Sequence, residues 1–218
     1  MNKIEGCDFL VVFPFYNGDA DLMLKNIRYL RTLTQSTKHH CLLSIDKGTS
    51  DQMVEDIKQE AEGLFEVVHT FKYPSPEKNP WPIPQNESFQ NTARYLEYVY
   101  KGSWFWYESD SVALRPEWID MLYNEYREAK KPFMGHVVKG VVPGTGHMNG
   151  VGIYPWCMSR FTTNAFMCRS TAWDVAMASQ MMNQCHTANH LIQHVWTENI
   201  QDTLTSTSLD RDWETCGS

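Results

Sequence analysis

An aromatic segment that ends in two acids constrains the fold of this chain more than any other feature. Trp104 to Tyr107 are four consecutive aromatic residues, and Glu108, Ser109 and Asp110 follow them directly. A short apolar run of this kind predicts a strand buried on both faces, as in a parallel sheet. Because ligands bind beyond the carboxyl ends of parallel strands, both acids are expected to face a functional site.

Two carboxylates at the end of a strand are candidate ligands for a hard divalent cation. Mg²⁺ and Mn²⁺ usually take one or two carboxylates, and waters and substrate phosphates complete the coordination. A metal-bound diphosphate is therefore the ligand that Glu108 and Asp110 would suit. The alternative is that both acids are solvated or cap the helix expected near Glu117, where Pro116 fits a first helical turn.

The rest of the chain alternates apolar segments with helical patterns. Strands are expected at 9–13, 40–46, 65–70 and 132–138, and helices at 22–33, from 50 onward, at 86–96 and at 117–130. This alternation predicts a parallel, doubly wound α/β sheet. At 218 residues the chain suits one domain, expected over 1–198, and the Ser- and Thr-rich residues 199–218 are expected to form a loosely ordered tail.

Composition and missing motifs exclude several classes of protein. No G-x-G-x-x-G fingerprint or P-loop is present, which argues against a nicotinamide enzyme or an ATPase. A net charge of −7 argues against broad binding to nucleic acid, and six cysteines without a C-x-x-C pair argue against zinc sites and disulfide frameworks. The start has no signal sequence and no apolar run has membrane length, so we expect a cytoplasmic protein without a membrane partner.

The aromatic strand, its acids and the following Val112 to Trp118 resemble the metal-binding segment of GT-A glycosyltransferases. The usual triplet of that family is Asp-x-Asp; Glu108 replaces the first Asp, and Asp110 keeps the last, which is the usual metal ligand. A weaker likeness covers about Phe9 to Trp196. The resemblance implies a single-domain, Rossmann-type, mostly parallel sheet flanked by helices. It also implies sugar transfer from a nucleotide diphosphate donor, with a UDP-sugar expected first and Mn²⁺ or Mg²⁺ as cofactor.

The resemblance also implies which residues contact the donor. In the family these positions are the turn after the first strand, an acid after the second, the helix before the metal strand, and a segment that presents its backbone to the sugar. The corresponding residues are Pro14, Tyr16, Asn17, Asp46, Asn86, Asn91, Arg94, Glu108, Asn149 and Gly150.

Most of these positions have a plain structural alternative. Asp46 could fix the turn that follows it, Arg94 could be a surface residue, and Asn149-Gly150 could form a hairpin turn. Asp19 or Asp21 is expected to cap the helix that starts nearby.

Asp174 and three histidines supply the remaining candidates. Thr171 and Asp174 fit the N-cap and third position of a helix start, which favours a capping role. The resemblance implies a second role, because inverting GT-A enzymes place near this position the carboxylate that deprotonates the acceptor. His186, His190 and His194 recur every four residues, which predicts one helical face, either solvated or zinc-binding. The resemblance instead implies that His194 closes the metal site.

The acceptor is expected against the C-terminal half of the chain, which provides that surface in the family. The candidate residues are the glycine-rich stretch 140–146 as a lid, Arg127, Lys130, Lys131, His136 and Lys139 as a basic cluster, and Trp156 and Arg160. Such a surface suits a hydroxyl on a saccharide or on an extruded base, and phage enzymes that glycosylate hydroxymethylated bases in DNA share this outline.

Two other functions remain open. A nucleotidyltransferase uses similar acids and metal, but normally carries a glycine- and basic-rich loop near the first strand, which is missing here. A non-catalytic nucleotide- or carbohydrate-binding module would keep the aromatic residues and show no turnover.

Overall fold

A computed structural model of the chain describes residues 3–34, 36–74, 81–139, 146–161, 170–188 and 191–194. Its main sheet has seven strands in the order β3-β2-β1-β4-β7-β6-β8. They are β1 (Leu10–Phe15), β2 (Thr37–Asp46), β3 (Phe65–Tyr73), β4 (Trp104–Trp106), β6 (Phe133–Lys139), β7 (Gly146–Tyr154) and β8 (Cys185–Thr187). Only β7 runs antiparallel to its neighbours in this sheet, so the predicted mostly parallel sheet is confirmed.

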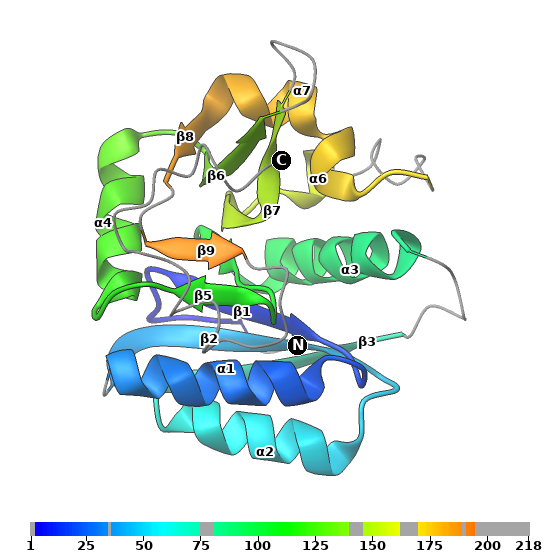
Figure 1. Ribbon diagram of the computed structural model, residues 1–218, viewed down its shortest axis with the longest axis vertical. Coiled ribbons are helices and arrows are strands. Elements are labelled where there is room, and N and C mark those ends of the chain that lie inside the picture. The colour runs from blue at the N-terminus through cyan, green and yellow to red at the C-terminus, as the bar shows by residue number, and fades with distance from the viewer. Residues whose placement is uncertain are drawn as a thin grey trace.

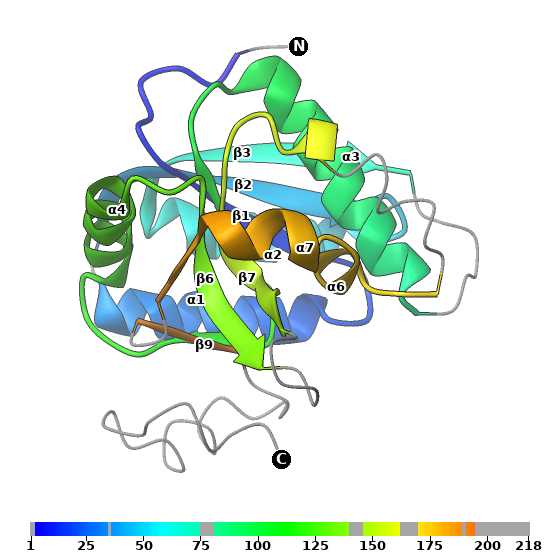
Figure 2. The ribbon, with the colours of Figure 1, turned by 90° about the horizontal axis from the view of Figure 1, so that it is seen from above.

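Helices cover both faces of the sheet (Figure 1). On one face lie α1 (Ala20–Leu33) and α2 (Asp51–Glu62), together with a two-stranded sheet of β5 (Ser111–Ala113) and β9 (Ile192–His194). On the other face lie α3 (Ile83–Val99), α6 (Trp173–Ala176), α7 (Ala178–Met181) and the 3₁₀ turn Met182–Gln184. Helix α4 (Trp118–Ala129) closes one side of the molecule, as Figures 1 and 2 both show.

The sheet separates two apolar cores. All six residues of β1 are buried, and successive side chains point to opposite faces, with Val11 and Phe13 toward α1 and α2 and Leu10 and Val12 toward α3. This two-sided burial explains why the strands read as unbroken apolar runs. None of the helices in the described ranges combines the length and the apolar character needed to cross a membrane.

Pro14 lies inside β1 rather than in the turn that follows it. The strand continues to Phe15, and Pro14 is buried opposite Ser44 of β2. A proline has no N–H to donate, so a central strand tolerates it only where no partner needs that group. The Val12 carbonyl points toward β4, and two residues later the backbone nitrogen of Pro14 points the same way. Because β4 has ended at that level, no strand residue needs a hydrogen bond from position 14.

The predicted helix through three histidines is wrong. His186 lies in β8, opposite Met134 of β6, whereas His194 ends β9, opposite Ser111 of β5. His190 and the side chain of His194 lie outside the described part of the chain. Each strand has only three residues, and its partner is distant in sequence, so the four-residue spacing does not reflect a helical face.

The hairpin alternative for Asn149-Gly150 is also wrong, because both residues lie within β7. The connection between β6 and β7, which contains residues 140–145 of the expected lid, lies outside the described residues, as does the expected tail 199–218. Because β7 is antiparallel to β4, its first residues arrive at the edge where β1 and β4 end.

Candidate active site

The turn after β4 sends its two acids to different sides of the sheet. The Tyr107 N–H still bonds to the Val12 carbonyl at 2.9 Å, and the turn closes where the Ser111 N–H donates to the Glu108 carbonyl at 3.0 Å. Glu108 then lies near Gly150 of β7, whereas Asp110 lies near Asp19 at the start of α1. Two groups of side chains result, which we call the Asp110 group (Asp19, Ser109, Asp110) and the Asp174 group (Glu108, His147, Gly150, Asp174).

Helix α1 fixes the turn that carries Asp110. The buried Asn26 amide donates to the Ser109 carbonyl at 3.1 Å and to the Ser111 carbonyl, and its oxygen accepts from the Tyr107 hydroxyl at 3.0 Å. One helix turn later, the Tyr29 hydroxyl donates to the Ala113 carbonyl at 2.9 Å. A buried amide with its polar atoms bonded in this way holds the turn in one conformation.

Asp19 is part of the Asp110 group and does not cap α1 through its side chain, contrary to expectation. One carboxylate oxygen accepts from the Tyr16 N–H at 2.8 Å, and the other accepts from the Ser109 hydroxyl at 2.9 Å. Burial raises the pKa of Asp19 to about 6, and the nearby charge of Asp110 adds to the effect. At neutral pH the ionised Asp19 therefore adds a second negative charge beside Asp110 at this edge of the sheet.

The other predicted donor residues of the first two strands lie at the same edge. Tyr16 is 50% exposed and covers Gly18, and Asn17 is exposed, so both are accessible from solvent. Asp46 accepts from the Gly48 N–H at 2.6 Å, which is the turn-fixing alternative. Burial raises the pKa of Tyr73, and the charges of Asp46 and Asp19 add to the effect.

In the Asp174 group, a carboxylate lies between a histidine and backbone donors. An Asp174 oxygen is 3.7 Å from His147 Nε2, and the other accepts from the Val175 N–H at 2.8 Å. Burial raises the pKa of Asp174, while the His147 charge and the backbone N–H groups of Val175 and Gly150 lower it. The carboxylate is thus mostly withdrawn from water beside a group that can exchange protons.

Gly150 is the point at which Glu108 meets β7. A Cβ at position 150 would lie 2.9 Å from a Glu108 oxygen and 3.4 Å from the Trp173 ring, so a side chain there would displace Glu108. Glu108 is held from its own strand by the Trp106 indole N–H at 3.0 Å. Asp174 also lies beside Gly150, whose N–H is one of the groups that lower its pKa, so Glu108 and Asp174 meet β7 at the same residue.

The start of α6 is capped by Asn86, not by Thr171 as expected. The Asn86 oxygen accepts from the Trp173 N–H at 2.8 Å, and its amide donates to the Thr171 carbonyl at 3.0 Å. This amide is buried and therefore positions the turn that carries Asp174. Of the other two donor candidates on α3, Asn91 is half-buried and Arg94 is exposed, as its surface alternative predicts.

The expected acceptor surface divides between opposite edges of the sheet. Trp156 and Arg160 follow Tyr154, which pairs with Trp104, the first residue of β4. They therefore lie at the amino edge, away from the acids. There Lys101 and Arg160 lie over the Trp156 ring, 4.5 and 5.0 Å from its centroid.

The end of α4 lies at that same amino edge. The Tyr126 hydroxyl contacts Ser103, just before β4, and the Pro132 carbonyl, so Arg127, Lys130 and Lys131 are also remote from the acids. In the basic cluster, only His136 and Lys139 lie on β6, which runs toward the carboxyl edge.

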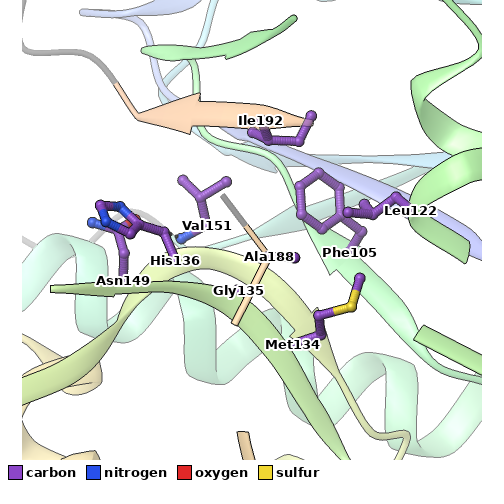
Figure 3. Close-up of a pocket in the computed structure, with 9 residues that line it drawn as sticks. All are labelled: Phe105, Leu122, Met134, Gly135, His136, Asn149, Val151, Ala188 and Ile192. Atoms are coloured by element: carbon purple, nitrogen blue, oxygen red, sulfur yellow. Dashed lines mark hydrogen bonds between the residues drawn. The ribbon is translucent and has the colours of Figure 1, made fainter. Parts of the chain in front are cut away.

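A small apolar pocket lies next to this edge and contains none of the four acids. Its lining residues are Phe105, Leu122, Met134, Gly135, His136, Asn149, Val151, Ala188 and Ile192 (Figure 3). His136 and Asn149 lie at one end of the pocket, and Phe105 and Leu122 lie at the other.

Asp110 and Asp19 are the candidate ligands for a metal ion at this edge. In the described ranges no three His, Cys, Asp or Glu side chains are arranged to hold a metal ion. Asp110 and Asp19 still fit a hard cation, because Mg²⁺ and Mn²⁺ take one or two carboxylates when phosphates and waters supply the rest. Burial is the main cause of the raised pKa of Asp19, and the charge of Asp110 adds to it, so a bound cation would stabilise the ionised form of Asp19.

Sequence reasoning missed Asp19, Asn26, Ser109 and His147 as members of the site. Asp19 carried a usable signal, since it follows the first strand just as Asp110 follows β4. Asn26 carried a weaker signal, because a polar residue on the apolar side of a predicted helix needs a buried partner. His147 carried no signal that distinguishes it from the other histidines of the chain.

No protein-family model and no curated protein matches the chain. Solved structures do match in fold. Galactosyltransferase LgtC, in complex with donor and acceptor sugar analogues, aligns with a TM-score of 0.59 at 10% identity, over 83% of this chain and 73% of that one. Core-mannan synthase A from Aspergillus fumigatus, in its Mn/GDP form, aligns with 0.56 at 7% identity, over 89% and 76%. TarS 1-349 from S. aureus in complex with UDP-GlcNAc aligns with 0.51 at 14% identity, over 83% and only 56%.

A nucleotidyltransferase shares the same arrangement of strands and helices. The putative glucose-1-phosphate thymidylyltransferase from Bacillus anthracis aligns with a TM-score of 0.58 at 6% identity, over 94% of this chain and 97% of that one. At these identities the matches establish the fold alone. Taken with the sheet order and the acid-ended β4, they show that this chain has a GT-A-like α/β fold, which LgtC and core-mannan synthase A share.

Proposed function

We propose that the protein is a metal-dependent glycosyltransferase that moves a sugar from a nucleotide diphosphate donor to a hydroxyl acceptor. A UDP-sugar is the donor that we propose before any other. One observation carries the proposal. The single turn after β4 brings Asp110 beside Asp19 and, from its other end, Glu108 beside Gly150, the residue that Asp174 also contacts. This arrangement offers a site for a charged diphosphate and a separate carboxylate for the acceptor. The bound UDP-GlcNAc of TarS and the Mn/GDP form of core-mannan synthase A support this choice of ligands.

In the proposed reaction, Asp174 acts as the general base. It accepts the proton of the acceptor hydroxyl as the hydroxyl oxygen bonds to the anomeric carbon, and the bond from that carbon to the diphosphate breaks with its electron pair on the diphosphate. His147 stabilises the ionised form of Asp174 before transfer. The Gly150 N–H keeps the carboxylate directed at the sugar position.

The donor is proposed to lie across the ends of β1 and β4. Tyr16, half exposed after β1, would stack on the base, and Asn17 would contact the ribose. A Mn²⁺ or Mg²⁺ ion, held by Asp110 and Asp19, would offset the charge on the leaving diphosphate. The sequence suggested Glu108 as a metal ligand, but we propose a different role. Glu108 lies beside Gly150, on the Asp174 side, and would bond to a sugar hydroxyl.

Incubation with a panel of nucleotide sugars and Mn²⁺ tests the proposal, with the released nucleoside diphosphate as readout. We expect one donor to be cleaved, and Asp110→Asn to abolish the release. Glu128→Gln, an exposed change on α4, serves as the matched control and should leave it intact. Binding of a nucleotide sugar without release of diphosphate in any acceptor mixture would instead indicate a binding module.

The thymidylyltransferase match supports a nucleotidyltransferase as the second candidate. That enzyme would join a nucleoside triphosphate to a sugar 1-phosphate and release pyrophosphate. Pyrophosphate formation in the presence of these two substrates, with no cleavage of nucleotide sugars, would replace the first proposal with the second.

The acceptor is proposed to be a saccharide hydroxyl, with a hydroxymethylated base in DNA as the alternative. The amino-edge position of Arg127 and Arg160 removes most of the basic surface that had favoured DNA. Transfer to hydroxymethylpyrimidine DNA at low and high salt decides between them. Activity that falls steeply with salt would indicate phosphate contacts and favour DNA.

A further inference from the structure

Strand β3 is the outermost strand of the seven-stranded sheet, and in the described part of the chain no strand pairs with its outer side. It is nine residues long, and most of its side chains are exposed or half-buried. A long exposed edge of this kind is a template for pairing with another chain, and proteins usually blunt it or use it.

The backbone direction of β3 fixes which residues could pair outward. The Tyr73 carbonyl accepts from the Lys47 N–H, so it points toward β2. Since alternate residues of a strand point their N–H and C=O groups the same way, Val67, His69 and Phe71 also face β2. The even-numbered residues from Glu66 to Lys72 therefore direct their hydrogen-bonding groups outward.

The sequence of β3 is complementary to itself in one antiparallel register. If His69 faces His69 of a second copy, Glu66 faces Lys72, Val67 faces Phe71 and Val68 faces Thr70. Opposite charges then meet at both ends, and apolar side chains meet between them. All nine residues from Phe65 to Tyr73 overlap in this register.

Apolar side chains on the α3 face of β3 would enlarge such a contact. Val67 is 37% exposed and Phe71 is half-buried, and Phe71 stacks on Tyr95 of α3 with ring centroids 4.1 Å apart. Tyr98, one helix turn after Tyr95, is 72% exposed. In a two-fold pair whose axis is perpendicular to the sheet, these side chains of both copies lie on the same face.

The centre of the register carries no charge repulsion at neutral pH. Burial and the neighbouring His40, whose Nδ1 is 3.3 Å from His69 Nε2, lower the pKa of His69. Two neutral imidazoles can therefore face each other across the axis.

We propose that two copies of this chain associate through β3, antiparallel about a two-fold axis at His69, and so form one continuous sheet. The interface is isologous, because each residue of one copy contacts the residue paired with it in the other. Lys72 already contacts Asp51 at 2.7 Å within its own chain. That contact is exposed and weak, and a lysine ammonium has donors for a second carboxylate.

Charge reversal at the two ends of the strand tests the proposal, with sedimentation velocity over a range of protein concentrations as readout. The wild-type chain should be a dimer. Glu66→Lys places lysines opposite Lys72 at both ends, and Lys72→Glu does the same with glutamates, so each should raise the dimer Kd about tenfold or more. The double variant Glu66→Lys/Lys72→Glu restores opposite charges and should restore the dimer.

Two further variants separate association from folding. Thr70→Pro removes an outward N–H without removing a bond to β2, so it should give a monomer with an unchanged far-UV circular dichroism spectrum. Glu128→Lys on α4 makes the same charge change away from β3 and should leave the dimer intact. A monomeric wild-type chain, or a double variant that stays as weak as either single variant, would overturn the proposal.

Discussion

The Asp110 group and the Asp174 group both contain a carboxylate withdrawn from water, but the surroundings of the two carboxylates differ. Both Asp19 oxygens accept from neutral donors, and its charged neighbour is another acid. Asp174 instead has His147 at 3.7 Å and backbone N–H groups around it. The first arrangement concentrates negative charge at a fixed place, whereas the second allows a proton to be exchanged. The difference teaches that one group is suited to holding a cationic complex and the other to acid–base chemistry.

The strongest test of this division is Asp174→Asn. The amide keeps the size of the side chain but cannot accept a proton from the acceptor, so we expect kcat to fall about 1,000-fold. Nucleotide affinity, measured by calorimetry with Mn²⁺ and a uridine diphosphate, should be unchanged. A parallel loss of nucleotide affinity would show that the two groups act as one.

Asp110→Asn should instead act mainly on nucleotide affinity. Loss of one carboxylate should weaken Mn²⁺-dependent nucleotide binding at least about 100-fold, since even indirect changes at metal sites cost 10- to 100-fold. The fold should survive, because Asn26 and backbone groups hold the turn. The same calorimetric titration checks the prediction, and unchanged affinity would remove Asp110 from the metal site.

A matched pair of amide variants extends the comparison to the supporting residues. Asn86→Ala and Asn26→Ala each leave buried partners unsatisfied, and each should lower the free energy of unfolding by about 2–3 kcal/mol in a urea titration. Asn86→Ala should also lower kcat, because it loosens the turn that carries Asp174. Asn26→Ala should weaken nucleotide binding instead, and an exchange of these two outcomes would contradict the division.

The smallest expected effect is on the pH dependence of stability. The pKa of Asp19 is about 6 in the fold and about 3.9 in an unfolded chain. Since the folded state holds the proton more tightly, this residue destabilises the protein as pH rises from about 4 to about 6. Asp19→Asn should therefore be more stable than wild type at pH 7 by about 1–2 kcal/mol and lose part of this pH dependence. Thermal unfolding in EDTA measures both, and identical pH profiles would contradict the raised pKa.

The main strands could be predicted because each buried strand is a continuous apolar run in the local sequence. β1, β2 and β4 are apolar runs followed by polar turns. The structure places Asp46 at the end of β2, and Asp19 and Asp110 just after β1 and β4, at one edge of the sheet. The edge that carries the site was therefore accessible from sequence. The position of Glu108 on the opposite side from Asp110 was not, because it depends on the path of a four-residue turn held by Asn26.

The C-terminal part was harder because its order comes from distant partners. β5 and β9 have three residues each and pair across about 80 positions of sequence, with no local pattern longer than a turn. The capping of α6 is similar, since Thr171 fits a cap in sequence while Asn86 makes the bonds. Local propensity cannot identify a partner that only tertiary packing supplies.

The dependence of α6 on Asn86 has a consequence for engineering. A helix of four residues has no stability of its own, and its first bond comes from a residue 87 positions away. The position of the Asp174 carboxylate thus depends on two segments of the chain, and neither segment specifies it alone. Grafting residues 170–181 onto another protein of this fold would transfer Asp174 without the bonds that orient it. An amide side chain at the equivalent of position 86 would have to be grafted as well.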